Sequence, residues 1–259
     1  MKGVVAFLLV LCYLAISVAA WTCTEAPRLY NVQQIDAGLG KVIARDQNYP
    51  YFLSGSSWYR LSTIRLKHVS VGPAGIWGVG SNNLVYKYIA GNFQQSRGLS
   101  MLQVDAGGND QVVGVNNGWG AYCLRSASAL AYSRPGSLSW TYLSRSMKYF
   151  SCSPHNGCWG VDRSYRVYYA QVNPSTCSSS AWRIVSGRSL QMIEVGTDGK
   201  VFGVSTTGQV VQRAGISSRY PYGTSWVTIP MCMRMRHVSY DQGKLWVVSQ
   251  SGFIMQCTH

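Results

Sequence analysis

The segment LKHVSVGPAGIWGVG, residues 66–80, contains the pattern on which the architecture depends. It predicts two short strands, 66–72 and 76–79, joined by a turn rich in Gly and Pro. Its second half contains an aromatic-Gly-Val core that recurs along the chain. The copies, from close to degenerate, are Trp77-Gly78-Val79, Trp159-Gly160-Val161, Phe202-Gly203-Val204, Trp246-Val247-Val248, Val113-Gly114-Val115 and Ile43-Ala44-Arg45. Recurrence of one pattern along the whole chain indicates a repeat array.

A second mark, Trp-x-x-Leu/Ile/Val, precedes the core at a nearly fixed distance. Trp58 and Trp140 lie 19 residues before it, Trp182 and Trp226 lie 20 before it, and Phe93 takes this place in another unit. Each unit then contains an inner strand, the core strand, a third strand such as 84–88, and an outer strand with the Trp mark. Units of four strands predict an all-β, six-bladed β-propeller. A β-sandwich is the alternative, but it would not require a Trp at a fixed offset.

The chain ends complete this scheme. The sixth unit has three strands and stops at His259, whereas Trp21-Thr22-Cys23-Thr24 resembles an outer strand. The N-terminal strand is therefore expected to complete the last blade and close the ring. Closure would place Cys23 beside Cys257 and predicts a disulfide between them.

The first 20 residues predict a secretory signal peptide. Lys2 supplies a positive start, 4–16 is almost wholly apolar, and 17–20 offers small residues for cleavage. A membrane anchor is the alternative, but the apolar run is short and no second span follows. We therefore expect a secreted, extracellular protein without membrane insertion, in which residues 21–259 form a single propeller domain.

The remaining cysteines fit an oxidising compartment. Cys152 and Cys158 flank one predicted turn, so a bridge between them is expected, and Cys123 and Cys177 are left as a pair that joins two blades. Cys232 has no partner in this scheme. It is either a free thiol or the site of an intermolecular bridge in a homo-oligomer. The scattered His residues and the absence of a close CxxC pair argue against a structural zinc site.

Composition argues against an enzyme built on carboxylates. The chain has 23 Lys and Arg against 9 Asp and Glu, a net charge of +14, which favours an anionic partner. Most acids fall at repeated positions, where a polar group more often forms hydrogen bonds between blades than it does chemistry. The aligned inner-strand positions are Asp36, Asp105 and Glu194 with Ser70, Ser151 and Ser239, and a second pair is His68 with His237. No Gly-x-Ser-x-Gly elbow is present.

Basic residues recur in the connections between outer and inner strands. Because strands alternate in direction, these connections share one rim with the loops that follow the core strand. The candidate anion-binding residues are Arg65, Lys67, Arg97, Arg145, Lys148, Arg188, Arg234 and Arg236. A cationic ring could bind phosphate or carboxylate groups of a glycolipid. A solvated surface is the alternative, and nucleic acid is not expected as the partner of a secreted protein.

The same rim offers polar side chains for a sugar, with aromatic residues close in sequence. The candidate sugar-binding residues are Asn82, Asn83, Asn116, Asn117, Asp162, Thr206, Thr207 and Gln250. Turn formation is the alternative role for each Asn, because Asn tolerates a left-handed backbone. The recurring Trp77, Trp159 and Trp246 are instead expected in the packing between blades.

The Trp-x-x-Leu/Ile mark followed by Trp-Gly-Val resembles the tectonin repeat, and the mature chain is similar to the fish egg lectins. This resemblance implies a secreted six-bladed propeller that binds N-acetylglucosamine and bacterial lipopolysaccharide. It also implies structural calcium in the central channel, although no cofactor is required for binding. Ile43 stands where the family has Trp, which questions a sugar site in the first blade, and Cys232 lacks the partner that the family pattern supplies.

Together these observations predict a non-enzymatic lectin for N-acetylglucosamine-containing glycans and lipopolysaccharide, acting in innate or egg defence. Several similar blades would add avidity on a repetitive surface. The alternatives are a secreted glycan hydrolase, which would show carboxylate-dependent turnover, and a propeller adaptor for host proteins, which free sugar would not inhibit.

Overall fold

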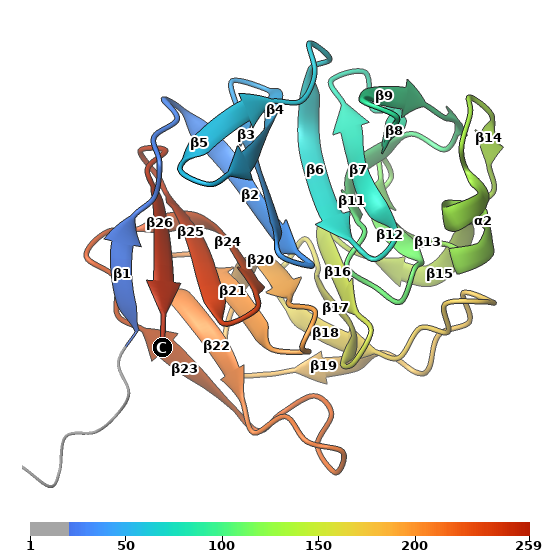
Figure 1. Cartoon of the computed structure of the whole chain (residues 1–259). Coiled ribbons are helices and arrows are strands. Elements are labelled where there is room, and N and C mark those ends of the chain that lie inside the picture. The colour runs from blue at the N-terminus through green and yellow to red at the C-terminus, as the bar shows by residue number, and fades with distance from the viewer. Residues whose placement is uncertain (1–20) are drawn as a thin grey trace, which may run out of the picture.

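The computed structural model describes residues 21–259 as six four-stranded antiparallel sheets set around a central axis (Figure 1). The predicted signal peptide, residues 1–20, lies outside the described residues. The innermost strand of each sheet contacts the innermost strands of both neighbouring sheets, so the inner strands form a closed ring. The chain is therefore a six-bladed β-propeller, as the repeats predicted.

The blades follow the chain in order, each running from the axis outward. Blade 1 contains β2 (Val32–Gly38), β3 (Lys41–Asp46), β4 (Tyr49–Ser54) and β5 (Ser57–Arg60). Blade 2 contains β6 (Leu66–Gly72), β7 (Gly75–Gly80), β8 (Val85–Ile89) and β9 (Asn92–Gln95). Blade 3 contains β11 (Met101–Asp105), β12 (Val112–Asn116), β13 (Gly120–Leu124) and β15 (Thr141–Ser146). Blade 4 contains β16 (Tyr149–Ser153), β17 (Gly157–Val161), β18 (Val167–Ala170) and β19 (Arg183–Val185). Blade 5 contains β20 (Leu190–Val195), β21 (Val201–Ser205), β22 (Val210–Ala214) and β23 (Ser225–Ile229).

Blade 6 is built from both ends of the described chain. It contains β24 (Met235–Asp241), β25 (Lys244–Ser249), β26 (Ile254–Thr258) and, outermost, β1 (Thr22–Glu25), which lies beside β26 in Figure 1. Cys23 pairs in register with Cys257, and their sulfur atoms form a disulfide. The predicted closure of the ring is confirmed.

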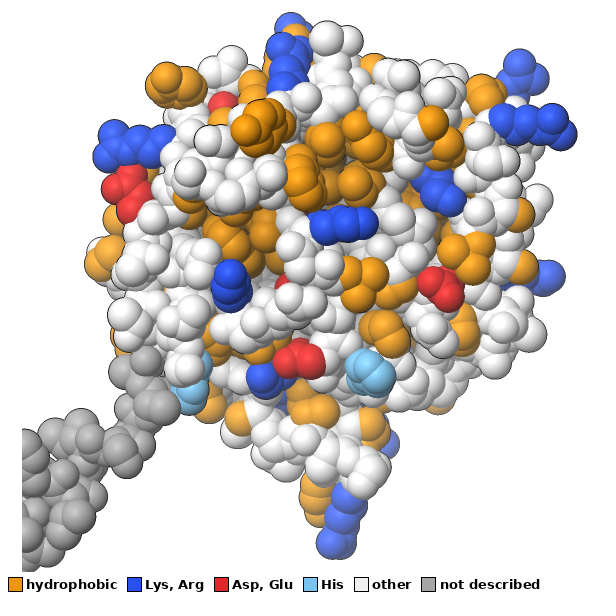
Figure 2. Space-filling model, in the orientation of Figure 1, with side chains coloured by type: hydrophobic (Ala, Val, Ile, Leu, Met, Phe, Trp, Pro, Cys, Tyr) orange, Lys and Arg blue, Asp and Glu red, His pale blue; other side chains and the backbone are white. Residues whose placement is uncertain are grey.

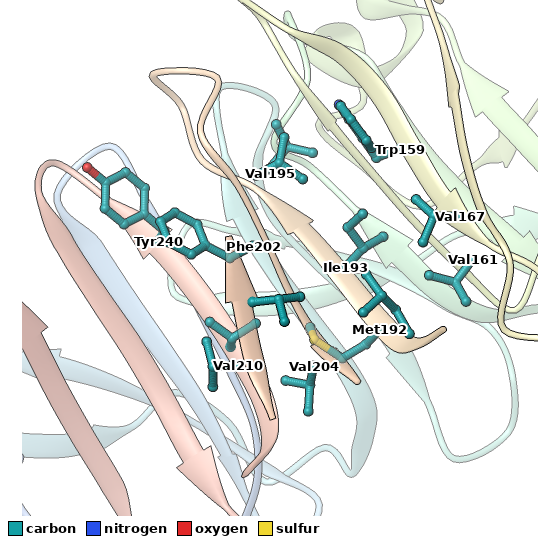
Figure 3. Close-up of a cluster of buried hydrophobic side chains, with 14 of the residues drawn as sticks. Trp159, Val161, Val167, Met192, Ile193, Val195, Phe202, Val204, Val210 and Tyr240 are labelled. Carbon is teal, nitrogen blue, oxygen red and sulfur yellow. The ribbon is translucent and has the colours of Figure 1, made fainter. Parts of the chain in front are cut away.

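The hydrophobic core lies between blades. The recurring aromatic residue of the core strand is buried against the next blade, and Figure 3 shows this for Trp159 and Phe202. The Phe202 ring stacks on Tyr240 of blade 6 with the ring centroids 4.7 Å apart. Trp77 and Trp246 are likewise buried, which confirms their expected packing role.

Steric crowding explains why the second residue of the aromatic-Gly-Val motif is glycine. A Cβ atom at Gly203 would lie 2.7 Å from Leu190 Cδ1 and 3.0 Å from the Met192 carbonyl oxygen. The inner strand has a register shift between Leu190 and Met192, which brings its backbone toward the core strand. Gly78 in blade 2 meets Leu66 Cδ1 at 2.8 Å in the same way.

The loops fall on two rims. The upper rim contains the loops from second to third strand and the links from one blade to the next, and the lower rim contains the other connections. The third-to-fourth connections are long in blades 3, 4 and 5 (125–140, 171–182 and 215–224) and short in blades 1 and 2 (55–56 and 90–91). The first of these contains α2 (Ser126–Ala131) and β14 (Ser137–Leu138), which pairs with β10 (Arg97–Gly98). Among residues 21–259, no helix has the length and apolar character needed to span a membrane.

The other two predicted disulfides are also present. Cys152 and Cys158 are paired across the hairpin of β16 and β17. Cys123 of blade 3 is bonded to Cys177 in the long connection of blade 4. Cys232 is an exposed free thiol.

Candidate functional site

The upper-rim turns are built by polar side chains that bond to their own backbone. Asn116 Oδ1 accepts a hydrogen bond from the Gly120 amide at 2.8 Å, and Ser205 Oγ accepts one from the Gln209 amide at 3.0 Å. In blade 2, Asn82 Oδ1 accepts a hydrogen bond from the Leu84 amide at 3.1 Å. These Asx and Ser turns fix the loops. The alternative role, turn formation, is therefore what the structure shows for Asn82 and Asn116.

In blades 1 to 5, a residue of the upper-rim turn links its blade to the next one. Asn83 has a left-handed backbone, with φ +67°, and its carbonyl accepts the amide of Met101 in the next blade at 2.8 Å. Tyr165 has φ +62° and accepts the Leu190 amide at 3.0 Å. Asn suits this backbone because its short polar side chain tolerates the left-handed region. The turns are thus rigid platforms on which neighbouring side chains are displayed.

Asp162 is occupied by its own loop. Its carboxylate is buried and accepts hydrogen bonds from the Ser164 and Arg166 amides at 2.8 and 2.9 Å, with Arg166 Nη2 at 2.7 Å. Burial alone would raise the pKa of Asp162, but the hydrogen bonds from Arg166 and Ser164 hold the pKa below its ordinary value. Asp162 therefore stabilises the turn, and its oxygens face donors of this chain.

Three neighbouring grooves lie along the upper rim, and we call them the rim grooves. The groove between blades 3 and 4 has a volume of about 310 Å³ and is lined by Arg145, Arg163 and Arg166. The groove between blades 4 and 5, about 600 Å³, is lined by Arg166 and Arg188 together with Thr206 and Thr207. The structure thus brings Arg188 together with both threonines that the sequence proposed for sugar binding.

The third rim groove is formed by blade 5 and by the link from blade 5 to blade 6, and it has a volume of about 470 Å³. It is lined by Thr207, Cys232 and Arg234. Each rim groove therefore contains at least one of the predicted basic residues. Arg166 lines two of the three rim grooves but was not among the predicted residues. The loop that holds Arg163 was the available signal, since it continues directly into Arg166.

Several rim cations lie against aromatic rings. The Arg145 guanidinium carbon lies 3.9 Å from the centroid of Tyr168, and Lys148 Nζ lies 4.5 Å from that of Tyr165. Such contacts hold a cation at the surface without neutralising it. Basic residues are not confined to this rim: Figure 2, which shows the face where the two ends of the described chain lie, has Lys and Arg spread widely and few Asp and Glu, in line with the net charge of +14.

The other predicted rim residues lie outside the three rim grooves. Lys67 Nζ donates to Asn83 Oδ1, and Arg236 donates to the carbonyl of Gln250. Asn117 and Gln250 are exposed in their loops. These predicted residues not found in the rim grooves are Asn82, Asn83, Asn116, Asn117 and Gln250 with Arg65, Lys67, Arg97, Lys148 and Arg236. Arg97 belongs to β10, which is paired with the blade 3 connection.

Arg45 and Arg236 show how dense the positive charge is near blades 1 and 6. Burial, and then the charge of Arg236, lower the pKa of Arg45 to about 10. An anion bound beside this pair would relieve that repulsion.

A second polar cluster lies at the propeller axis. Its members alternate between acids and serines, and they are Asp36, Ser70, Asp105, Ser151, Glu194 and Ser239. Ser239 Oγ donates to Asp36 Oδ1 at 3.0 Å, and Ser151 Oγ donates to Glu194 Oε2 at 2.9 Å. These groups are buried and hydrogen-bonded between blades, which is the structural role that the repeat predicted.

Burial dominates the titration of this axial ring. It raises the pKa of Asp36 to about 6, and with the charge of Asp36 it raises the pKa of Asp105 to about 8. The pKa of Glu194 is also raised well above its ordinary value by burial and the charges of Asp36 and Asp105. Burial lowers the pKa of His237 to about 3. These perturbed groups are closed off from substrate, so their shifts mark a structural network.

The axial side chains do not fit the expected calcium ion. Within the described part of the chain, no group of three or more His, Cys, Asp or Glu residues could hold a metal ion. The carboxylates of Asp36 and Asp105 accept hydrogen bonds from the Val71 and Cys152 amides at 2.6 and 2.9 Å, so protein donors already occupy them. Calcium bound by backbone carbonyls in the channel stays a prediction, which metal analysis of extensively purified protein tests.

Comparison with known proteins gives one family and one sequence relative. Residues 31–250 match the tectonin domain family. A fish-egg lectin from Cyprinus carpio is 39% identical over 158 residues, which is 60% of this chain and 65% of the carp protein. The match thus spans slightly less than two thirds of that relative.

Solved structures share the architecture at low identity. A gluconolactonase from Xanthomonas campestris has a TM-score of 0.67 with 10% identity, over 95% of this chain and 92% of that one. A virginiamycin B lyase from Staphylococcus aureus has a TM-score of 0.61 with 9% identity, over 92% of this chain and 99% of that one. At this identity, the likeness concerns the fold alone.

Proposed function

The chain belongs to the tectonin domain family, and from that premise we propose that it is a secreted lectin. Its ligands are glycans that contain N-acetylglucosamine, including bacterial lipopolysaccharide, and its role is innate or egg defence. The similarity to the carp fish-egg lectin supports carbohydrate binding. The three disulfides fit an extracellular protein.

The observation that carries the proposal is the row of rim grooves. The groove between blades 4 and 5 combines the Arg188 guanidinium with the hydroxyls of Thr206 and Thr207, both of which are exposed. A guanidinium can bind a phosphate or carboxylate with two hydrogen bonds, and hydroxyls suit sugar oxygens. Three such grooves side by side would bind a repetitive glycolipid surface with avidity.

Binding of lipopolysaccharide should depend on the positive charge of the rim grooves, whereas binding of free sugar should not. Reversing two exposed groove residues, Arg188→Glu with Arg234→Glu, should weaken lipopolysaccharide binding about tenfold or more, equal to about 1.4 kcal/mol. The affinity for lipopolysaccharide should also fall as salt rises, because exposed charges are screened beyond about 8 Å at physiological ionic strength. The unaltered protein and this double variant should bind free N-acetylglucosamine with the same affinity. Surface plasmon resonance at two salt concentrations measures both effects.

A matched control separates the grooves from general surface charge. Arg134 and Arg219 are exposed in long lower-rim connections, so Arg134→Glu with Arg219→Glu makes the same change in net charge away from the rim grooves. The proposal requires this control to keep most of its lipopolysaccharide affinity. Equal losses in the two double variants would reduce the positive charge to general surface character.

We also propose that the protein is not an enzyme. A glycosidase needs two carboxyl groups that reach a sugar from opposite sides. The three axial acids are buried, and Asp162 is held in its turn. Hydrolysis of an N-acetylglucosamine oligomer by purified protein, lost on replacing one carboxylate, would contradict this part of the proposal.

A further inference from the structure

At the lower rim, one position on the third strand of each blade faces the space between that blade and the next. The third-strand residue opposite the core residue faces the next blade, as the strand registers show. In chain order this position holds Phe52, Lys87, Cys123, Tyr169, Gln212 and Gln256. The core residue beside it is apolar in every blade, whereas this residue ranges from a phenylalanine to a lysine.

At three of the six positions, this residue meets a long connection of the next blade. Lys87 Nζ donates to the Ala129 and Tyr132 carbonyls of the blade 3 connection at 2.7 and 3.1 Å. The Tyr132 ring packs on Trp77 with centroids 6.0 Å apart. We call such a connection a plug, because its carbonyl groups and the Tyr132 ring fill the space between the two blades.

The other two plugs use different chemistry. Cys123 is bonded to Cys177 of the blade 4 connection. Tyr169 lies beside Tyr222 of the blade 5 connection, with ring centroids 6.3 Å apart. Each of the long connections in blades 3, 4 and 5 therefore covers the space between its own blade and the preceding one.

The other three spaces have no such plug. Between blades 1 and 2, the ring of Phe52 packs against the hydrophobic cluster of these blades, and the blade 2 connection is only Ala90 and Gly91.

The two spaces that remain lie between blades 5 and 6 and between blades 6 and 1. The blade 1 connection is only Gly55 and Ser56, and in blade 6 the chain ends take the place of a connection. Gln256 there lines a cavity of about 310 Å³ between blades 6 and 1, and Gln212 lines one of about 270 Å³ between blades 5 and 6. We call them the lower cavities.

The two lower cavities share a construction. Each has a lysine at the start of the core strand, Lys244 or Lys200, together with its glutamine. Each also has an indole in its lining: Trp21 is half-buried, whereas Trp246 is only 4% exposed and can offer no more than an edge of its ring. Ammonium and amide groups can donate to hydroxyl or acetamido oxygens, while an indole offers an apolar surface.

The charge of the lower cavities is balanced, in contrast to the rim grooves. Lys200 Nζ lies 3.1 Å from Asp198 Oδ2 and donates to the Tyr240 hydroxyl at 2.8 Å. Asp241 lines the same cavity as Lys244. A nearly neutral polar cavity of this size favours one uncharged sugar ring over an anion.

We propose that the two lower cavities are binding sites for a neutral pyranose, on the rim opposite the cationic grooves. The carbohydrate class rests on the proposed lectin function, whereas the position of the sites rests on the cavities alone. The molecule would then bind neutral sugar at one rim and anionic glycolipid at the other. Occupancy of the lower cavities should not depend on salt.

The test fills each cavity with a residue that the propeller already uses. Blade 4 has Tyr169 at this position, so Gln256→Tyr and Gln212→Tyr copy an existing arrangement. Calorimetric titration with N-acetylglucosamine should show one site fewer in each single variant and a loss of both in the double variant. Gln94→Tyr, on the outer strand of blade 2, is the matched control and should bind as the unaltered protein does.

The outcomes separate this inference from the lectin proposal. Unchanged sugar binding in a folded Q212Y/Q256Y protein would overturn the lower cavities as sites. If the tyrosines prevent folding, Lys244→Ala and Lys200→Ala, both at exposed positions, take their place, with the same expected loss of affinity. Salt-dependent lipopolysaccharide binding without any neutral sugar binding would overturn the inference and leave the rim-groove proposal standing. Suppose instead that Q212Y/Q256Y loses sugar binding while Arg188→Glu with Arg234→Glu leaves lipopolysaccharide binding unchanged. That result would support the lower cavities as sites and overturn the rim-groove proposal.

Discussion

The three axial acids are buried, with only 4 to 5% of each residue exposed. Asp36, Asp105 and Glu194 come from alternate blades, and each is held by serines, a tyrosine or backbone amides of its neighbours. Ser151 Oγ faces both Asp105 Oδ2 and Glu194 Oε2, but one hydroxyl has a single proton to donate. The axial ring therefore needs protonated carboxyl groups to satisfy all of its oxygens.

This ring makes stability depend on pH in a defined direction. The folded pKa values of Asp36 and Asp105, about 6 and about 8, exceed their ordinary value of 3.8. Their contribution to the free energy of unfolding is therefore complete below about pH 4 and is lost as pH rises through 6 to 8. His68 and His237, whose pKa values are lowered, lose their contribution as pH falls below 6.5, so the two effects oppose each other in acid.

The range from pH 6.5 to 8 isolates the carboxyl groups. Above pH 6.5 the histidines are at most half protonated in the unfolded state, and losing that charge as pH rises favours folding. A fall in the melting temperature between pH 6.5 and 8, which we expect, can therefore come only from the carboxyl groups. Asp105→Asn cannot ionise and should flatten that slope. Calorimetric scans of both proteins across this range measure it, and an equally steep slope in the variant would show that Asp105 is not the titrating group.

At the scale of elements, the repeat predicted the strands well. The expected inner strand 66–72 is observed as β6, and the expected strands 76–79 and 84–88 are observed within one residue at each end as β7 and β8. These segments were predictable because their alternation and turn residues recur. The predicted Trp marks likewise lie in or directly before outer strands, as Trp58 and Trp182 show.

The long connections were not predicted, for a physical reason. Residues 125–140 contain α2, a helix of one and a half turns without a side-chain cap. Its stability comes from Lys87, which binds its last carbonyls, and from Tyr132 on Trp77. Those contacts join residues far apart in sequence, and the equivalent connections of blades 4 and 5 use a disulfide and a pair of tyrosine rings instead. The predicted rim residues and the lower cavities also differed in how far the sequence could reveal them. The topology of the repeat was enough to place the basic residues on one rim. The lower cavities depend on which connections are long, and the repeat does not determine that.

The plug between blades 2 and 3 can be tested directly. Tyr132 is buried and its hydroxyl donates to the Gln95 carbonyl at 2.8 Å, whereas Leu130 nearby is 54% exposed. We expect Tyr132→Ala to lower the free energy of unfolding by about 3 kcal/mol, as for other buried aromatics, and Leu130→Ala to change it by less than about 0.5 kcal/mol. Urea denaturation compares the two. Similar small effects would mean that the connection is only loosely attached.

At the scale of the whole molecule, the ring is closed by one blade made from both chain ends. Breaking Cys23–Cys257 by paired Ser substitutions removes a cross-link over 234 residues, and breaking Cys152–Cys158 removes one over 6. Chain entropy gives losses of about 5 and about 2 kcal/mol respectively. Reversible denaturant unfolding should rank them in that order. The opposite ranking would show that the closing strand contributes little to the propeller.

The proposed separation of functions between the two rims would also be a property of the whole ring. Basic residues from several blades meet at the upper rim, while the lower cavities lie where the ring closes, beside blade 6. Binding to a repetitive surface would therefore engage several sites on one molecule.

Glycan-array binding of the purified protein, with free sugars as competitors, tests the central claim most directly. The account predicts binding to glycans that contain N-acetylglucosamine, strong inhibition by free N-acetylglucosamine, and much weaker inhibition by galactose. Binding that neither sugar inhibits, or no binding to any glycan by protein with its three disulfides intact, would contradict the assignment as a lectin.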